Sequence, residues 1–298
     1  MKKALGIDIG GTKIAVGLID ENGSVLAENK VTSNISTKET MFASLTEAID
    51  QLVEKIDMPL SQLSFGVGVP GLVNREQGIA VFQNNLPWEN FPIVARIQEK
   101  YPEILGVTID NDVYQAAYAE WKAAKLSAGD TLTFITASTG ISSASLTNGA
   151  FIRGQGFAGE IGLLPRPKNG EKLTLEDSVG GNNLAKRAAE KLNRPEITTK
   201  EIFAGYFAQQ PAETAIVTEW IADFAYGIYA MITVLDPMVI VLGGSIIKLN
   251  PDLLPTIKEE IKKLMIPAQY RSLEQIKISD YDNNAGLIGA GLSGMDKF

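Results

Sequence analysis

One pattern occurs twice in this chain: an apolar run, a tight turn of small residues, and two further short runs. The first copy spans Ala4 to Thr32 and turns at Gly10-Gly11. The second spans Thr131 to Arg153 and turns at Ala137-Ser138-Thr139-Gly140. Short apolar runs separated by such turns are typical of antiparallel strands. A duplicated unit of this kind predicts two similar lobes with a cleft between them.

Helical and strand patterns alternate along the rest of the chain, which predicts an α/β fold. Apolar spacing of three and four predicts helices over residues 37–56, 93–100, 113–125, 183–192, 199–208, 212–235 and 251–265. Short apolar runs predict buried strands at 65–69, 107–109, 239–242 and 276–279. Loops are expected at 83–92 and 153–181, and a small-residue helix at 283–290 that packs closely against a neighbour.

These elements suggest a domain boundary between residues 111 and 112. We expect a small N-terminal lobe over 1–111 and a larger C-terminal lobe over 112–283. The C-terminal helix, at about 284–298, is expected to pack back on the small lobe.

The composition indicates a soluble globular protein with a small-molecule partner. The 298 residues carry a formal net charge of −8, without the clustered Lys and Arg that nucleic acid requires. The apolar region 224–247 is divided by Asp236-Pro237, which argues against a membrane span. Because Met1-Lys2-Lys3 runs directly into a strand, we expect no secretory signal and a cytoplasmic location.

The chain contains no cysteine and no histidine. Disulfides, thiol nucleophiles and zinc sites of the usual His/Cys type are therefore excluded. A general base must be Asp, Glu, Lys or Tyr.

The first turn, Asp8 to Lys13, has the composition of a site for a nucleotide tail. Gly10 and Gly11 offer backbone N–H groups and Thr12 a hydroxyl to a phosphate, while the Asp8 carboxylate can face a magnesium ion. Lys13 can reach a phosphate oxygen. The same residues also fit an ordinary hairpin turn, with Lys13 as a solvated strand residue.

Two more small-residue turns follow buried strands, at Thr139-Gly140 and at Gly243-Gly244. Together the three turns predict a nucleotide held by two turns on its phosphates and one against its adenosine. Asp112 supplies a reactive carboxylate at the start of a helix, where the dipole and free N–H groups are expected to keep it ionised. The alternative is a simple N-terminal helix residue behind the capping Asn111.

Several motifs, in order along nearly the whole chain, resemble those of the ROK family of sugar kinases. They are Asp8-Ile9-Gly10-Gly11-Thr12, Gly66-Val67-Gly68-Val69-Pro70-Gly71, Asn85-Leu86-Pro87-Trp88, Asp110-Asn111-Asp112, Gly159-Glu160-Ile161-Gly162, Gly243-Gly244-Ser245 and Asn284-Ala285-Gly286-Leu287-Ile288-Gly289. The resemblance implies the actin-like ATPase (ribonuclease H-like) fold, with two lobes that each hold a mixed five-stranded sheet flanked by helices. It also implies transfer of the ATP γ-phosphoryl group to a hexose hydroxyl, usually that on C6, and a homodimer.

The resemblance assigns roles to individual residues. Asp112 matches the catalytic base, and Asp8 matches the carboxylate that positions Mg²⁺, through water. The residues that match or lie in sugar-binding motifs are Asn111, Glu160, Glu176, Gly71 and Asn85. An aspartate suffices as the base, because a loose phosphoryl-transfer transition state needs mainly alignment and charge neutralisation.

Two departures from the family pattern place the chain in a smaller branch. Leu163 stands where most members carry a sugar-contacting His, and Pro165 to Thr174 lacks the Cys cluster that binds structural zinc. This resembles the zinc-free branch that includes β-glucoside kinases. The second turn, Ser138 to Ser143, contains less glycine than is usual, and we expect lower activity where side chains restrict the approach of phosphate.

The expected acceptor is glucose or the glucosyl unit of a β-glucoside, with N-acetylmannosamine or fructose as alternatives. A protein of another class, a non-catalytic sugar-binding regulator, is the second possibility, because the family includes repressors. Those carry a DNA-binding helix-turn-helix before the Asp-containing strand, whereas here that strand begins at Ala4. The intact Asp112 also favours catalysis.

Overall fold

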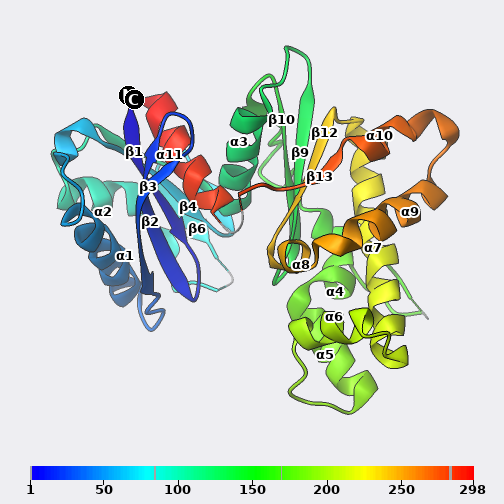
Figure 1. Cartoon of the computed structure of the whole chain (residues 1–298). Coiled ribbons are helices and arrows are strands. Elements are labelled where there is room, and N and C mark those ends of the chain that lie inside the picture. Colours follow the sequence, from blue (N-terminus) through cyan, green and yellow to red (C-terminus); the bar gives the residue numbers. More distant parts are fainter. Residues whose placement is uncertain (1, 84, 169, 282–283) are drawn as a thin grey trace. The chain divides into compact units, whose positions relative to one another are not determined.

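The computed structural model describes residues 2–83, 85–168, 170–281 and 284–298. It divides into two compact units: unit 1 comprises Met1–Lys125 and Asn284–Phe298, and unit 2 comprises Leu126–Asn283. The last helix, red in Figure 1, thus belongs to unit 1. The division follows Lys125 rather than Asn111, because helix α3 (Asp112–Ala124) packs against α11 (Ala285–Lys297) and β4 of unit 1.

A five-stranded sheet in the order β3-β2-β1-β4-β8 forms the centre of unit 1. The strands are β1 (Lys3–Ile9), β2 (Lys13–Asp20), β3 (Val25–Thr32), β4 (Ser64–Val69) and β8 (Gly106–Asn111). The first three are antiparallel, as the sequence predicted, and β4 and β8 run parallel to β1. Parallel pairing brings the carboxyl ends of β1, β4 and β8 to one edge of the sheet, where Asp8, Val69 and Asn111 lie.

Helices cover both faces of this sheet. Helix α1 (Lys38–Val53) is capped by Thr37, whose hydroxyl accepts the N–H of Thr40, and packs on β2 and β3. Helix α2 (Ile93–Lys100) contacts β8. Because side chains alternate along a strand, Leu5 and Ile7 of β1 enter the core with α1, while Gly6 and Asp8 face α11.

Glycines allow α11 to lie directly on the sheet. A Cβ at Gly6 would lie 2.0 Å from the carbonyl oxygen of Leu287, and one at Gly66 would lie 1.7 Å from that of Ala290. This confirms the prediction that a small-residue helix packs closely against a neighbour. The contact brings helix backbone against strand backbone, a separation that no larger side chain would permit.

Unit 2 repeats the arrangement with a five-stranded sheet in the order β11-β10-β9-β12-β13. Its strands are β9 (Thr131–Ala137), β10 (Ile141–Thr147), β11 (Ala150–Phe151), β12 (Val239–Gly243) and β13 (Ile276–Ile278). Its helices are α4 (Leu175–Val179), α5 (Gly181–Leu192), α6 (Thr199–Phe207), α7 (Pro211–Leu235), α8 (Ser245–Leu249), α9 (Leu254–Leu264) and α10 (Arg271–Glu274). The first three strands are antiparallel, and β12 and β13 run parallel to β9.

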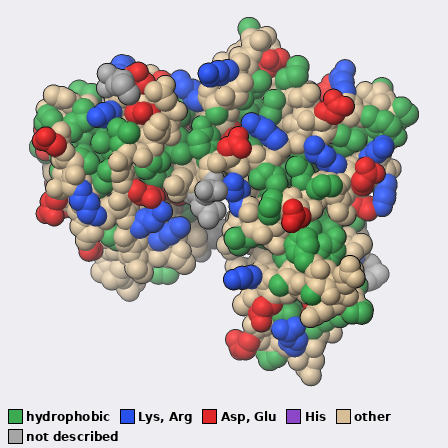
Figure 2. Space-filling model, in the orientation of Figure 1, with side chains coloured by type: hydrophobic (Ala, Val, Ile, Leu, Met, Phe, Trp, Pro, Cys, Tyr) green, Lys and Arg blue, Asp and Glu red, His purple; other side chains and the backbone are tan. Residues whose placement is uncertain are grey.

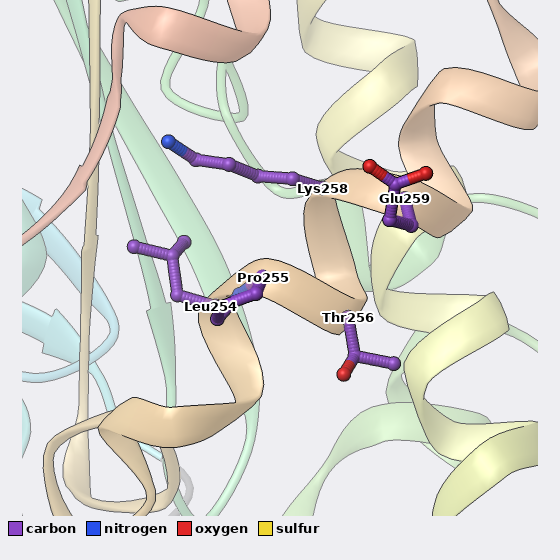
Figure 3. Close-up of a pocket in the computed structure, with 5 residues that line it drawn as sticks. All are labelled: Leu254, Pro255, Thr256, Lys258 and Glu259. Carbon is purple, nitrogen blue, oxygen red and sulfur yellow. The ribbon is translucent and has the colours of Figure 1, made fainter.

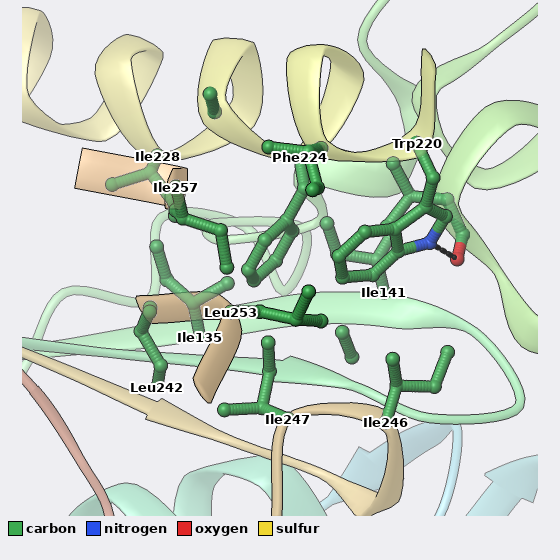
Figure 4. Close-up of a cluster of buried hydrophobic side chains, with 14 of the residues drawn as sticks. Ile135, Ile141, Trp220, Phe224, Ile228, Leu242, Ile246, Ile247, Leu253 and Ile257 are labelled. Carbon is green, nitrogen blue, oxygen red and sulfur yellow. Dashed lines mark hydrogen bonds between the residues drawn. The ribbon is translucent and has the colours of Figure 1, made fainter. Parts of the chain in front are cut away.

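The core of unit 2 is built from large side chains between α7 and the sheet. In Figure 4, Phe224 and Ile228 of α7 point toward Ile135 and Leu242 of the strands. Trp220 also enters the core, and its Nε1–H donates to the carbonyl of Val179 at 2.8 Å, so its one polar atom is satisfied. By length and composition alone α7 could cross a membrane, but its apolar side chains are those that form this core.

The structure contains elements that the sequence did not predict. A three-stranded sheet of β5 (Leu72–Asn74), β6 (Ile79–Phe82) and β7 (Glu89–Phe91) extends into the expected loop at 83–92, and α4 lies in the expected loop at 153–181. These segments are too short for a periodic signal, and tertiary contacts stabilise them. Residues 84 and 169 of the two expected loops and residue 283 of the expected small-residue helix lie outside the described residues.

Candidate active site

The first turn joins β1 to β2 and is held from a third strand. The N–H of Gly10 donates to the carbonyl of Lys13 at 3.0 Å. Ser33, just after β3, donates its hydroxyl to the carbonyl of Gly10 at 2.6 Å and its N–H to that of Thr12 at 3.1 Å. Thr12 and Lys13 remain exposed. Sequence analysis missed Ser33, since no local pattern links it to a turn that is distant along the chain.

Two predicted site residues from different motifs meet at this turn. A Cβ at Gly11 would lie 3.0 Å from the backbone oxygen of Asn85 and 3.2 Å from its Nδ2. The loop that carries Asn85 is anchored by Trp88, whose ring stacks on Phe91 with centroids 4.9 Å apart and whose Nε1–H donates to the carbonyl of Lys38. Because Gly11 has no side chain, Asn85 can lie directly against the predicted phosphate turn.

Asn111 and Gly71 also meet. The Asn111 side-chain oxygen caps α3 by accepting the N–H of Val113 at 2.9 Å, as the sequence allowed, and its Nδ2 donates to the carbonyl of Gly71 at 3.0 Å. Gly71 has a φ of +80°, and a Cβ there would lie 2.3 Å from the carbonyl oxygen of Phe82. Glycine is required at this position, so the side chain of Asn111 has a fixed backbone partner.

Asp8 and Asp112 form a pair of carboxyl groups with perturbed acidity. Burial raises the pKa of Asp8 to about 6, and the positive charges of Lys13 and Lys30 oppose this rise. Burial and the negative charge of Asp8 raise the pKa of Asp112 to about 7, although the N–H of Val113 donates to its carboxylate at 2.9 Å. The expectation that the helix terminus keeps Asp112 fully ionised is wrong, because burial and the neighbouring charge outweigh the N–H groups.

This pair fits a magnesium ion that is held mainly by a nucleotide. Among the described residues, no three or more acidic side chains gather as a protein-only cation site. Mg²⁺ commonly uses one or two carboxylates together with substrate phosphates and water. Two acids whose pKa values are both raised by burial match this requirement, since a cation would offset the cost of their charges.

The second and third turns, both in unit 2, lie together. In the second turn the N–H of Ser138 donates to the carbonyl of Gly140 at 2.8 Å, and the carbonyl of Ser138 accepts the N–H of Gly181 at 2.9 Å. Gly244 has a φ of +86°, and a Cβ there would lie 2.3 Å from the carbonyl oxygen of Ala137. Thr139 accepts the N–H of Asn182 through its carbonyl at 3.3 Å. Both predicted turns therefore share one edge of the unit 2 sheet, with Gly243 in register with Thr136.

Glu176 lies directly against the second turn. Its carboxylate accepts the N–H of Ile141 at 2.7 Å, and a Cβ at Gly140 would lie 2.5 Å from its Oε1. Burial raises its pKa, whereas the hydrogen bond from Ile141 opposes this rise. A predicted sugar-binding residue is thus packed beside a predicted phosphate turn, a relation that the sequence did not reveal.

The segment Gly159–Gly162, which lies beside Glu176 and the second turn, places Glu160 at the surface. Gly159 has a φ of +93°, and its carbonyl accepts both the N–H and the hydroxyl of Ser143. A Cβ at Gly162 would lie 3.1 Å from Oε2 of Glu176, which links the segment to that carboxylate. The side chain of Leu163, where the family pattern has His, is 62% exposed.

A separate depression of about 510 Å³ lies along α9. Figure 3 shows its lining residues, which come from the start of this helix: Leu254, Pro255, Thr256, Lys258 and Glu259. None of them belongs to a predicted site motif, and we do not assign this depression to the active site.

Comparison with known proteins identifies the family. The ROK family model matches residues 4–293, so the chain belongs to the ROK family. It is 27% identical to a glucokinase of Halalkalibacterium halodurans, over 96% of this chain and 93% of that protein. It is 29% identical to a β-glucoside kinase of Listeria innocua, over 97% of this chain and 96% of that protein.

A solved structure agrees with this assignment at the level of the fold. The ROK glucokinase of Streptomyces griseus, solved with glucose and AMPPNP, superposes with a TM-score of 0.82 at 24% identity and covers 99% of each chain. The predicted actin-like ATPase fold, with mixed sheets flanked by helices, is therefore confirmed.

Proposed function

We propose that this protein is an ATP-dependent sugar kinase that transfers the γ-phosphoryl group to a hydroxyl of glucose or of the glucosyl unit of a β-glucoside, at C6. The observation that carries the proposal is Asp112, a carboxyl group at the start of α3 whose pKa is raised to about 7 beside Asp8. A general base works best when its pKa lies near the operating pH. The named glucokinase and β-glucoside kinase relatives support the same chemistry.

Asp112 accepts the proton of the attacking hydroxyl. The N–H of Val113 donates to Oδ1 of its carboxylate, which orients the group. Asn111, Gly71, Asn85, Glu160 and Glu176 are the residues that we assign to the binding of sugar hydroxyls. Carboxylates and amides suit a polyol, because each can accept from or donate to neighbouring hydroxyl groups.

The nucleotide and its metal are bound by the turns. Asp8 holds Mg²⁺ through water, and Gly10, Gly11, Thr12 and Lys13 bind phosphate oxygens. Thr139 and Gly140 also bind phosphate oxygens, and Gly243 and Gly244 lie against the adenosine. Mg²⁺ supplies neutralisation of the phosphate charge that develops during transfer. No role is assigned to zinc, since the chain has no cysteine or histidine.

We further propose a cytoplasmic homodimer that binds neither nucleic acid nor membrane. On the face of each unit in Figure 2, basic and acidic side chains are interspersed. Exposed apolar side chains of unit 2, Val234, Met238 and Ile266, follow or end helices α7 and α9, which contact each other. Side chains of this kind suit a contact with a second copy.

The direct test measures ADP release with Mg-ATP and glucose, cellobiose, gentiobiose, fructose, mannose or N-acetylmannosamine as acceptor. We expect the highest kcat/KM with glucose or a β-glucoside. A preference for fructose or N-acetylmannosamine would correct the acceptor. Sugar binding without ADP release from any acceptor would instead favour a non-catalytic regulator.

A further inference from the structure

The segment between the two predicted sugar-binding glutamates of unit 2 is a short hairpin. Its described residues are 164–168 and 170–174, so it starts shortly after Glu160 and ends at the cap of α4, which carries Glu176. The N–H of Arg166 donates to the carbonyl of Leu173 at 2.7 Å, and that of Leu175 to the carbonyl of Leu164 at 2.8 Å. The hairpin is therefore joined to the segment of Glu160 at one end and to the helix of Glu176 at the other.

Two cations on the hairpin are tied to one buried anion on helix α7. Arg166 donates its Nε–H to Oδ1 of Asp223 at 2.7 Å, and Lys168 donates its ammonium to Oδ2 of the same carboxylate. Lys168 also donates to Glu219 at 2.6 Å, and the Arg166 guanidinium lies 4.7 Å from the centre of the Tyr226 ring. We call Arg166, Lys168, Glu219 and Asp223 the α7 ion-pair cluster.

The helical side of this cluster is rigid. Glu219, Asp223 and Tyr226 follow each other at four and three residues along α7, so they lie on one face of the helix. The neighbouring Trp220 and Phe224 are buried in the core of unit 2, where their rings stack with centroids 5.0 Å apart. The hairpin is thus fastened to an element that the core holds in place.

Burial gives the cluster more strength than a surface pair. The side chain of Asp223 is 2% exposed, so its charge is shielded from water and salt and depends on both cations. The hydrogen bond from Lys168, together with its charge, lowers the pKa of Glu219. Both oxygens of Asp223 are occupied, which fixes the hairpin at two points.

We propose that Asp223, through Arg166 and Lys168, is a positioning residue that holds the hairpin and thereby Glu160 and Glu176 in the geometry for sugar binding. The inference rests on the proposed hexose kinase function. Asp223 does not touch the reacting atoms. Its loss weakens sugar binding more than it slows phosphoryl transfer, which depends on Asp8 and Asp112 of unit 1.

Asp223→Asn is the test variant. It keeps the size of the side chain and one acceptor, and the cations it releases retain access to water, so the fold is expected to survive. We expect the KM for glucose to rise about tenfold or more while kcat changes less than about threefold. The amides of Arg166 and Leu175 should exchange hydrogen about tenfold faster without substrate, while those of strand β9 are unchanged. The double variant Arg166→Gln/Lys168→Gln should show both effects together with lower stability, because it leaves the buried charge of Asp223 without its two cations.

Asp236→Asn is the matched control. Asp236 pairs with Arg271 in the same unit, but its side chain is 55% exposed, and we expect no change in KM or exchange. With an active wild-type enzyme, an unchanged KM in Asp223→Asn would overturn the positioning role alone. Faster exchange throughout unit 2 with equal losses in kcat and kcat/KM would also overturn it, in favour of a general stabilising role. A wild-type enzyme that phosphorylates no hexose would overturn the proposed function itself.

Discussion

The two units share one strand order, but helix α11 in unit 1 and helix α7 in unit 2 pack on their sheets in different ways. In unit 1, glycines let α11 lie against strand backbone, and Gly289 brings the same helix onto the backbone of α3 at Gln115. In unit 2, α7 stands off from the sheet on large side chains such as Trp220 and Phe224. Both units have a side-chain core on one face of the sheet, and unit 1 adds α11, which lies backbone to backbone on its strands.

This difference in packing affects how the predicted acidic site residues of each unit are held in position. Asp8 lies on the α11 face of β1, beside Gly286, and Asp112 begins the helix that α11 also contacts. Close backbone packing leaves these carboxyl groups little freedom, and it removes water that would otherwise stabilise their charges. In unit 2 one glutamate lies just before the hairpin and the other on the short helix after it, and these segments depend on specific polar contacts such as the α7 ion-pair cluster.

The prediction with the largest expected effect asks whether the aspartates that follow β8 and β13, the last strands in the order of the two five-stranded sheets, have the same role. Asp112 follows β8, and Asp280 follows β13, the strand at the same place in the unit 2 sheet. We expect Asp112→Asn to lower kcat by about a thousandfold or more, because the general base is lost, and to retain sugar binding. Turnover with Mg-ATP and glucose, together with sugar titration, measures both.

Asp280→Asn is the control and should keep its turnover within about threefold of wild type. If Asp112→Asn retained most of the wild-type rate, Asp112 would not be the base.

A second prediction tests the two packing modes directly. Gly66→Ala places a Cβ 1.7 Å from the backbone oxygen of Ala290, which cannot move without shifting α11. Gly227→Ala, in α7, meets the end of the Leu175 side chain at 2.6 Å, and that side chain can rotate. We expect Gly66→Ala to cost at least about 3 kcal/mol of unfolding free energy or to prevent folding. Gly227→Ala should change stability by less than about 1 kcal/mol, because helix propensity offsets the contact.

Denaturant unfolding of both variants provides the measurement. Similar losses in the two would show that the packing of the units does not differ in the way described.

The smallest expected effect compares two helix-terminal aspartates. The pKa of Asp112 is raised from 3.8 to about 7, mainly by burial, whereas that of Asp177 at the start of α4 is lowered by the N–H and hydroxyl of Thr174. Between pH 4 and 7 the unfolded chain has released the proton that folded Asp112 retains. Stability from Asp112 therefore falls as pH rises through this window, and Asp112→Asn should be more stable than wild type at pH 8 by roughly 2 kcal/mol.

The effect of Asp177 on stability depends on pH in the opposite direction. Its stabilising contribution is present above its pKa in the unfolded chain and is lost as the pH falls through its lower pKa in the folded protein. Asp177→Asn should thus be less stable than wild type at pH 8. The difference for Asp112→Asn should shrink as the pH falls from 7 to 4, and that for Asp177→Asn should shrink below about pH 4, so thermal melts from about pH 2 to 8 measure both. A stabilising effect of Asp112→Asn that persists unchanged at pH 4 would exclude the raised pKa as its cause.

Much of the site could be predicted from the sequence, because its parts lie in contiguous turns. The residues Asp8 to Lys13, Asn111-Asp112 and Gly243-Gly244 occur at strand ends, where period-two patterns stop at small or polar residues. The prediction failed where a role depends on distant contacts. Helix α4 was interpreted as a loop, and no local signal linked Ser33 to the first turn or Asp223 to the hairpin.

The sequence by itself determined the duplicated strand pattern, the family, the turns and the exclusion of cysteine and histidine chemistry, since these depend on residue type and short-range spacing. Only the tertiary structure decided the acidity of Asp112, because it depends on burial and on the charge of a residue far away in the chain. The same holds for Glu176 against the second turn and for the buried partner of the hairpin. The physical reason is that electrostatic and packing energies depend on distances in space, which the order of residues does not state.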